Sequence, residues 1–198
     1  MIAKKCLHIA FIPFPFIIFF IFFSFITKIA ITIAIFLSTL QIFFIFFFRD
    51  VKREIEDDII SPADGKILYA KNNKISIFMG IFDMHVNLMP YDGKIVKMKY
   101  YEGAHKPAYK NVSKNERMEI EIESEIGKIK LIQIAGIFAR RIVPYVKEEE
   151  YLKKGERIGI IRFGSRVEVI LPKNCKIVVK EKEKIKAGKR IAIASQQI

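Results

Sequence analysis

Residues 7–48 read LHIAFIPFPFIIFFIFFSFITKIAITIAIFLSTLQIFFIFFF, and this stretch divides the chain into two parts. It holds 14 of the 18 phenylalanines, and its only charged side chain is Lys28. A bilayer core of about 30 Å needs about 20 apolar helical residues, roughly half of what this stretch offers. The sequence therefore predicts a transmembrane helical hairpin as a membrane anchor at residues 1–48. Its two passes are expected at about 7–27 and 29–48, with a turn near Lys28.

Basic residues flank the predicted hairpin on both sides, namely Lys4, Lys5, Arg49, Lys52 and Arg53. By the positive-inside rule, both ends of the hairpin and the domain that follows lie on the cytoplasmic side of the cell membrane. A cleaved signal peptide fits poorly, because the apolar stretch is much longer than an h-region and no A-x-A site follows it. A re-entrant hairpin stays open as an alternative, since Pro13 and Pro15 can break the first pass.

From residue 49 onward the composition is that of a folded β domain. Short β-rich runs are separated by turn residues, and Glu119–Ser124 (EIEIES) alternates strictly between polar and apolar side chains. Asn72-Asn73 and Asp92-Gly93 are turn signals typical of hairpins. The expected strands are Lys66–Ala70, Lys74–Phe78, Lys94–Tyr100, Met118–Ser124 and Lys128–Ile134. The sequence predicts a mainly β fold, in which residues 49–198 form a barrel- or sandwich-like domain.

Several classes of site are disfavoured by the residues available. Cys6 and Cys175 stand alone, without C-x-x-C spacing, so neither a disulfide framework nor a thiolate metal site is expected. No Walker A, HExxH or GxGxxG pattern occurs. The formal net charge of +13 would suit nucleic acid, but the apolar hairpin and the lack of a stacking platform argue against that partner.

The informative stretch of the β domain is Ile161–Pro172, IRFGSRVEVILP. Taken alone, its Gly164-Ser165 pair would be an ordinary turn. Three further motifs precede it in order: SPADGKI at Ser61–Ile67, FDMHVNLMPYDG at Phe82–Gly93 and NER at Asn115–Arg117. In this order and spacing, the motifs resemble the short form of the phosphatidylserine decarboxylase proenzymes. The resemblance extends from Arg49 to the C-terminus and is closest to the archaetidylserine decarboxylases.

This resemblance implies a self-processing carboxy-lyase of phospholipid biosynthesis. Members of the family cleave themselves at the bond that matches Gly164–Ser165, which here would give chains 1–164 and 165–198. The serine becomes an N-terminal pyruvoyl group, which serves as the electron sink for decarboxylation, so neither pyridoxal phosphate nor a metal is required. The expected reaction converts archaetidylserine to archaetidylethanolamine. The family also implies a heterodimer of the two cleaved chains, and its precedent suggests a homo-oligomer.

Two residues match the family's functional groups besides the cleavage site. His85 matches the functional histidine, which would serve as a base for the Ser165 hydroxyl. Asp64 matches its acidic partner, which would orient the imidazole. Without the family context, His85 would be a histidine at a strand edge and Asp64 a turn residue. Longer members carry a second histidine where this chain has Leu88, so how His85 divides its roles stays open. Asp83 and His105 are weaker candidates.

The charge of the β domain suits an anionic lipid substrate. Residues 49–198 carry 31 basic and 21 acidic side chains. Arg140, Arg141 and Arg166 are candidates for contacts with the lipid phosphate or the departing carboxylate, although each equally fits a solvated basic surface. Ordinary phosphatidylserine is the alternative substrate, and the 38 isoleucines favour the ether lipid only weakly. From another class, a non-catalytic, membrane-tethered scaffold is the remaining alternative.

Overall fold

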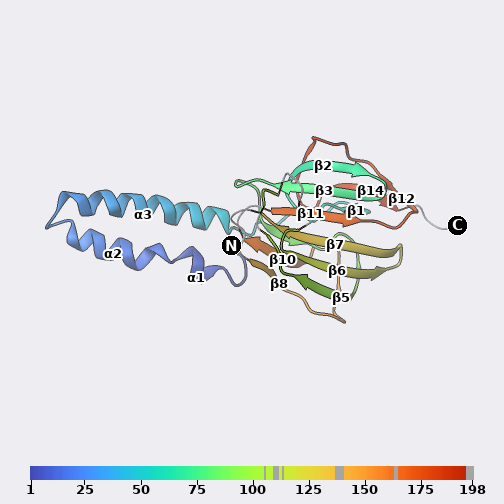
Figure 1. Ribbon diagram of the computed structural model, residues 1–198, viewed down its shortest axis with the longest axis horizontal. Helices are drawn as coiled ribbons and strands as arrows, with labels where there is room; N and C mark the ends of the chain where they lie inside the picture. The colour runs from blue at the N-terminus through green and yellow to red at the C-terminus, as the bar shows by residue number, and fades with distance from the viewer. Residues whose placement is uncertain (105, 109–111, 113, 137–140, 163–164, 195–198) are drawn as a thin grey trace. The chain divides into compact units, whose positions relative to one another are not determined.

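The computed structural model describes the chain except for residues 105, 109–111, 113, 137–140, 163–164 and 195–198 (Figure 1). The chain divides into two compact units, Met1–Val51 and Lys52–Ile198. The division falls within a few residues of the change in composition after Phe48. The first unit is helical, and the regular elements of the second unit, within the described residues, are all β-strands, in agreement with the mainly β fold predicted from the sequence.

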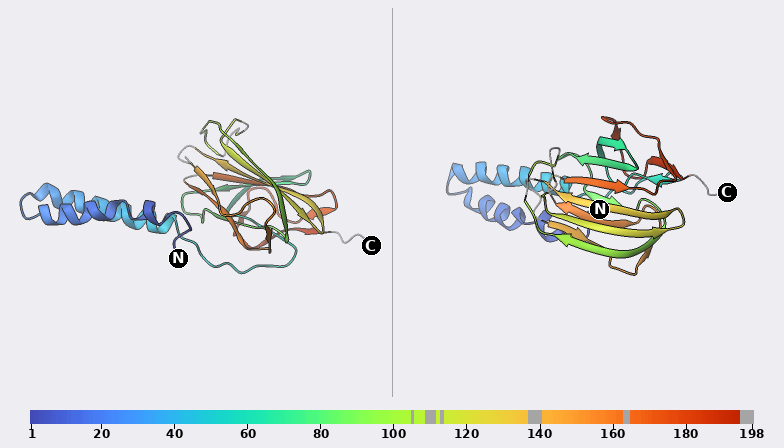
Figure 2. Two further views of the ribbon diagram at one scale, coloured as in Figure 1. Left: turned by 90° about the horizontal axis from the view of Figure 1, so that it is seen from below. Right: turned by 45° about the vertical axis from the view of Figure 1, so that its right-hand side comes forward.

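The N-terminal unit contains a short helix α1 (Leu7–Ala10), α2 (Pro13–Phe23) and α3 (Lys28–Phe47). Helices α2 and α3 run side by side in opposite directions (Figures 1 and 2). Within residues 7–27, where the first pass is expected, the structure has two helices, and the second of them ends at Phe23. A helix boundary falls at Phe11 and Ile12, because Pro13 has no amide hydrogen to continue the preceding helix and is instead suited to the first turn of α2.

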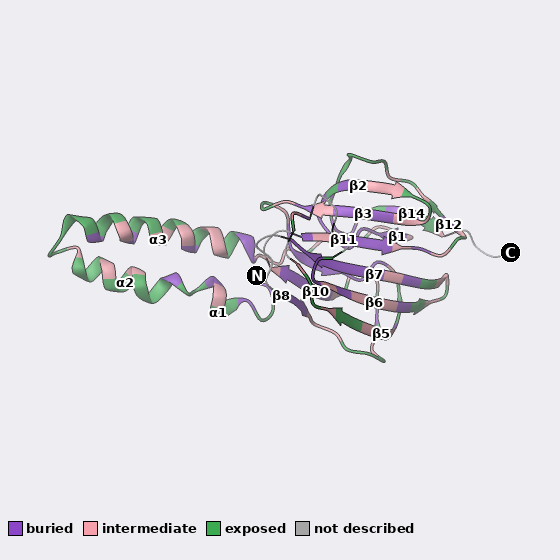
Figure 3. Cartoon of the chain, viewed as in Figure 1, coloured by how far each residue is buried: buried purple, intermediate pink, exposed green. Residues whose placement is uncertain are grey.

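Among the described residues, α3 is the one helix with the length and hydropathy needed to cross a membrane. Apolar side chains of the unit are widely exposed within the chain, as the green segments of α2 and α3 in Figure 3 show. Phe22 and Phe25 are 73% and 89% exposed. Such exposed aromatic surface is unfavourable in water and fits an apolar surrounding.

The second unit is organised around an antiparallel eight-stranded sheet (Figure 1). From one edge to the other, the strands are β13 (Lys184–Ile185), β2 (Gly65–Lys71), β3 (Lys74–Met79), β11 (Ser165–Ile170), β7 (Gly127–Ala135), β6 (Arg117–Ser124), β5 (Gly93–Tyr101) and β9 (Tyr151–Leu152). Strand β11 therefore lies in the interior of the sheet, between β3 and β7.

Two three-stranded sheets complete the unit. The first contains β4 (Val86–Leu88), β10 (Arg157–Arg162) and β8 (Arg141–Pro144), with β10 in the middle. The second contains β1 (Ile59–Ile60), β14 (Arg190–Ala194) and β12 (Cys175–Ile177), with β14 in the middle. Both therefore combine segments that are far apart in the sequence.

The five strands expected from the sequence are confirmed as β2, β3, β5, β6 and β7. In β6 the isoleucines are buried and alternate with glutamates that are partly or fully exposed, as the EIEIES pattern requires. Asn72 and Asn73 both have positive φ, 48° and 59°, and close the β2–β3 hairpin as a two-residue turn. Asp92-Gly93 leads into β5 but closes no hairpin, since β4 pairs with β10 instead.

One large hydrophobic cluster fills the second unit. Its members come from all three sheets and include Ile59, Ile67, Ile77, Ile120, Ile158 and Val167. Burying each such side chain contributes about 1.5–3 kcal/mol. Strands β7, β10 and β11 are largely buried (Figure 3). The core packs against Val167 and Val169 of β11, and the neighbouring strands β3 and β7 hold the two edges of that strand.

Candidate active site

Ser165 is the first residue of β11 and is completely buried. Its Cα partners across the sheet are Met79 at the end of β3 and Ala135 at the end of β7. The Ser165 hydroxyl makes no hydrogen bond to any described residue. Leaving a buried hydroxyl without a partner costs about 1–3 kcal/mol, which a purely structural serine has no reason to incur. Gly164, the expected partner of Ser165 at the cleavage site, lies outside the described residues.

His85 is also completely buried and immediately precedes β4. Its Nδ1 lies 2.9 Å from the carbonyl oxygen of Asp83, and its own carbonyl accepts a hydrogen bond from the Ile161 amide of β10. Because a carbonyl oxygen can only accept, Nδ1 must carry the hydrogen in the neutral ring, which leaves the lone pair on Nε2. The imidazole is thus held in the tautomer in which Nε2 can take up a proton.

Asp64 lies just before β2, and its carboxylate is fully buried. It accepts hydrogen bonds from Arg53, from Lys186 at 3.3 Å and from the Ala187 amide at 2.8 Å. Two cations therefore compensate this buried anion, as a buried charge requires. The expected hydrogen bond between Asp64 and His85 is not among these contacts, so the role of Asp64 in orienting the imidazole stays a prediction.

The glycine after Asp64 has a conformational requirement. Gly65 has φ +154°, and a Cβ at this position would lie 2.2 Å from the carbonyl oxygen of Phe78 in β3. Only glycine allows the two backbones to approach so closely. The Asp-Gly pair of the SPADGKI motif therefore combines a buried carboxylate with the close β2–β3 contact that positions it.

Buried amides surround the strand ends next to Ser165. The Asn115 side chain donates to the carbonyl oxygens of Ala135 at 2.7 Å and Lys106 at 2.8 Å. The Ala135 amide in turn donates to the carbonyl oxygen of Glu116. The Gln133 side chain donates to that of Asn87 at 2.7 Å. These contacts fix the end of β7 beside Ser165 and connect β7 to β4, the strand that follows His85.

Glu116, the second residue of the NER motif, is almost completely buried. Desolvation of the phenol and its hydrogen bond to the Glu116 carboxylate raise the pKa of Tyr100 to about 12. Tyr100 therefore stays protonated at physiological pH and acts as a hydrogen-bond donor to this carboxylate.

The arginines proposed as substrate contacts differ in their surroundings. Arg166 pairs with Glu168 on its own strand and donates to the Ser76 hydroxyl on β3, so it ties β11 to β3. Arg141 is exposed at the start of β8. Arg140 lies outside the described residues. The expected contacts of these arginines with the substrate remain predictions.

Three residues that contact the candidate residues or their strands are absent from the sequence-based candidates: Gln133, which bonds to Asn87, and Arg53 and Lys186, which both pair with Asp64. A signal existed for Gln133, the one polar residue in the apolar run Leu131–Ala135. Arg53 counted as a juxtamembrane charge, and nothing in its local sequence indicates that it pairs with Asp64. Among the described residues, no group of three or more His, Cys, Asp or Glu side chains is placed to hold a metal ion.

Comparison with known proteins identifies the family to which the chain belongs. The profile of the family described as phosphatidylserine decarboxylase matches residues 40–193, which is most of the chain. The chain therefore belongs to the phosphatidylserine decarboxylase family, and the family and the enzyme class expected from the sequence, a carboxy-lyase, are confirmed.

Individual relatives share more than 40% of their residues with the chain. A putative archaetidylserine decarboxylase proenzyme of Archaeoglobus fulgidus is 44% identical, covering 78% of this chain and 80% of that protein. A phosphatidylserine decarboxylase proenzyme of Syntrophus aciditrophicus is 45% identical, covering 79% and 81%. A putative archaetidylserine decarboxylase proenzyme of Methanosarcina barkeri is 41% identical, covering 80% of each chain.

Proposed function

We infer that the chain is a proenzyme that cleaves itself before Ser165 and then decarboxylates archaetidylserine to archaetidylethanolamine at a membrane. The observation that carries this proposal is the buried Ser165 hydroxyl, which has no hydrogen-bond partner among the described residues and begins an interior strand. A hydroxyl that is buried from solvent and makes no hydrogen bond to a described residue is available as a nucleophile toward the preceding peptide bond. The relatives are named as proenzymes, which agrees with such a processing step.

The self-cleavage would proceed on this chain's own atoms. The Ser165 Oγ attacks the carbonyl carbon of residue 164, and the acyl group moves from nitrogen to oxygen to give an ester. Loss of the Cα hydrogen and expulsion of the carboxylate of residue 164 leave a dehydroalanine at position 165. Hydrolysis of that residue releases ammonia and yields the pyruvoyl group. His85, which is held with its lone pair on Nε2, is the proposed base for the hydroxyl.

The residues around Ser165 fit a pyruvoyl group. The buried position at the start of β11 shields a reactive ketone from bulk solvent, and the strands β3 and β7 hold the new chain terminus in place. Such a group supplies a carbonyl that accepts the electrons of the bond broken as CO2 leaves. His85 can transfer protons both in self-cleavage and in decarboxylation. Longer family members have a second histidine at the position of Leu88, so here His85 would serve both reactions.

The ether-lipid substrate is proposed on the basis of the archaeal relatives, several of which are named putative archaetidylserine decarboxylases. Phosphatidylserine presents the same head group, and a relative named for it is equally similar. Assays of the purified chain with each lipid in mixed micelles distinguish the two substrates.

We propose that α3, together with α1 and α2, anchors the chain in the cell membrane with the β unit on the cytoplasmic side.

Intact mass spectrometry of the purified full chain tests the proposal. We expect two chains, residues 1–164 and 165–198, with the smaller one blocked by a ketone at its N-terminus. Ser165→Ala should give a single chain of 198 residues. Ser124→Ala is the matched control, because its hydroxyl bonds to Gly127 in the β6–β7 turn, and it should be cleaved normally. A wild-type chain that stays whole in native membranes would reject the enzyme and favour the tethered scaffold.

A further inference from the structure

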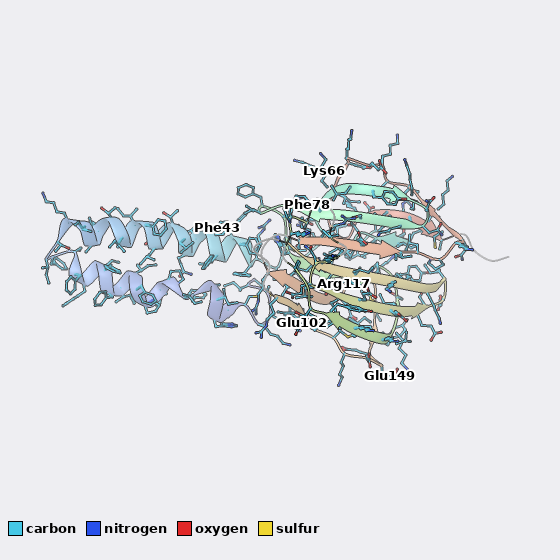
Figure 4. All side chains as sticks on the ribbon, viewed as in Figure 1. Phe43, Lys66, Phe78, Glu102, Arg117 and Glu149 are labelled. Carbon is cyan, nitrogen blue, oxygen red and sulfur yellow. The ribbon has the colours of Figure 1, made fainter. Side chains whose placement is uncertain are left out.

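A pocket of about 360 Å³ lies at one edge of the eight-stranded sheet, within the size range of ligand sites. Lysines at positions 66, 184 and 186 line it, together with Phe78 and the turn that follows β3. Figure 4 shows Lys66 and Phe78 on the neighbouring strands β2 and β3. Of the residues discussed for the candidate active site, only Gly65, Phe78, Asp83 and Lys186 line this pocket, and neither Ser165 nor His85 does.

The positions of the lysines lower the stability of the β2–β13 strand pair. Lys66 and Lys184 are directly opposite each other on β2 and β13, and both are exposed. Like charges in directly opposed positions destabilise a strand pair. Neither forms an ion pair with another described residue, whereas Lys186 is already paired with Asp64. An anion in the pocket would offset the repulsion, so the arrangement is that of an anion site.

The rim of the pocket is apolar and held in a fixed turn. The Asp83 amide donates to the carbonyl oxygen of Gly80 at 3.0 Å, and the Gly80 amide donates to the Asp83 carboxylate at 2.9 Å. This double closure places Ile81 and Phe82 at the corner of the turn. They are 52% and 75% exposed, and Phe82 is the most exposed large hydrophobic side chain among the described residues of Lys52–Ile198. A turn that presents two adjacent apolar side chains beside three cations has the composition of a membrane-interface contact.

We propose that this pocket and its rim form a lipid-docking site of the β unit. Lys66, Lys184 and Lys186 hold the phosphate of an anionic lipid head group, while Ile81 and Phe82 enter the apolar layer beside it. The ammonium groups gain from the negative potential of an anionic surface, and the two apolar side chains leave water. The site acts in addition to the proposed decarboxylation chemistry and does not depend on self-cleavage.

The chain contains no tryptophan, so a single Phe82→Trp substitution makes a fluorescent reporter in the full chain. The reporter is reconstituted into vesicles of equal parts phosphatidylglycerol and phosphatidylcholine with brominated acyl chains. We expect a blue-shifted emission that the bromine atoms quench. Tyr151→Trp is the matched control, since Tyr151 is 62% exposed and lies on β9 at the opposite edge of the sheet, and it should remain unquenched.

Charge is tested in the Phe82→Trp background. Lys66→Gln combined with Lys184→Gln should lower the docked population roughly thirty-fold at a low fraction of anionic lipid. Lys97→Gln combined with Lys176→Gln removes the same charge from exposed positions elsewhere and should leave quenching unchanged. Each variant is also measured in the Ser165→Ala background, which is expected to stay uncleaved, so that an effect on docking is distinguished from an effect on self-cleavage. Two results would overturn the proposal. In the first, the emission of the Phe82→Trp reporter shows that the side chain stays in water when vesicles are present. In the second, quenching persists both in pure phosphatidylcholine and after the two pocket lysines are replaced.

Discussion

Asn115 connects two separate stretches of chain beside Ser165 through the carbonyl oxygens of Ala135 and Lys106. We predict that Asn115→Ala slows self-cleavage, because Ala135 is the cross-strand partner of Ser165 and its carbonyl would lose a buried donor. The loss of stability should be about 2–4 kcal/mol, since two carbonyl oxygens lose their donor. The cleaved fraction is followed over time on denaturing gels, and stability is followed by thermal unfolding.

Asn174→Ala is the control for this effect, since the Asn174 side chain also donates to a backbone carbonyl, that of Ile126 in the β6–β7 turn, and lies beyond the opposite end of β11 from Ser165. It should lose less stability and cleave at the parent rate. If Asn115→Ala were destabilised but cleaved as fast as the parent, Asn115 would be only structural and would not position Ser165.

Glu119 gives the fold a dependence on pH. Partial burial raises the pKa of its carboxyl, but hydrogen bonds from Lys130 at 2.7 Å and Arg117 at 2.9 Å outweigh this and lower the pKa below its ordinary value of 4.5. A lowered pKa in the folded state contributes stability that is present above pH 4.5 and is lost as the pH falls through the folded-state pKa. Glu119→Gln should therefore cost about 1 kcal/mol at pH 7 and much less in acid.

Denaturant unfolding of Ser165→Ala chains at pH 7 and at acidic pH measures this difference without the complication of cleavage. Glu123→Gln serves as the control on the same strand, because Glu123 is exposed and forms no ion pair with a described residue. An equal effect of Glu119→Gln at both pH values would show that the side chain acts through its shape and not through its charge.

The residues of the site were predictable to different degrees. Ser165 and His85 are candidates because they stand in motifs that resemble those of a family, and the structure buries both side chains. The partners of Asp64 were not, because Lys186 is 122 positions away in the sequence and meets it only when β13 pairs with β2. Local sequence therefore nominates candidate residues, whereas the contacts that compensate a buried charge depend on strand pairing.

At the scale of elements, periodicity predicted the strands well and the helices less well. The alternation in β6 determines which face of the strand is buried, so its position could be read directly. A continuously apolar stretch has no such marker. The break between α1 and α2 depends on Pro13 and on how the carbonyl oxygens freed by it are satisfied, which hydropathy alone does not show.

The helix break explains one contact in the N-terminal unit. The Ala10 carbonyl has no regular helical partner, since the Phe14 amide bonds to Phe11 instead, and the buried Gln41 side chain of α3 donates to it. We predict that Gln41→Leu loosens α1 and α2 by about 1 kcal/mol, so that their amides exchange hydrogen roughly five-fold faster in nanodiscs. Ser38→Ala removes a hydrogen bond within α3 alone and should leave exchange in α1 and α2 unchanged. Equal exchange in both variants would contradict this role of Gln41.

At the scale of the whole molecule, the product 165–198 would not be a detachable tail. It includes β11, which pairs with β3 and β7, and β14, which pairs with β1. Its Lys186 also pairs with Asp64 of the other product. Separating the chains would break an interior strand out of the sheet and expose Val167 and Val169, which are completely buried.

We therefore predict that the two products stay together through purification in mild detergent and elute at the position of the uncut Ser165→Ala chain in size-exclusion chromatography. They should separate only in strong denaturant, where the ladders on both sides of β11 are broken. The cut falls before Ser165, the first residue of β11, so the whole strand keeps its cross-strand partners in β3 and β7 and folding can precede cleavage without loss of the core. A small product that is lost during native purification would show that the interior position of β11 does not survive the cut.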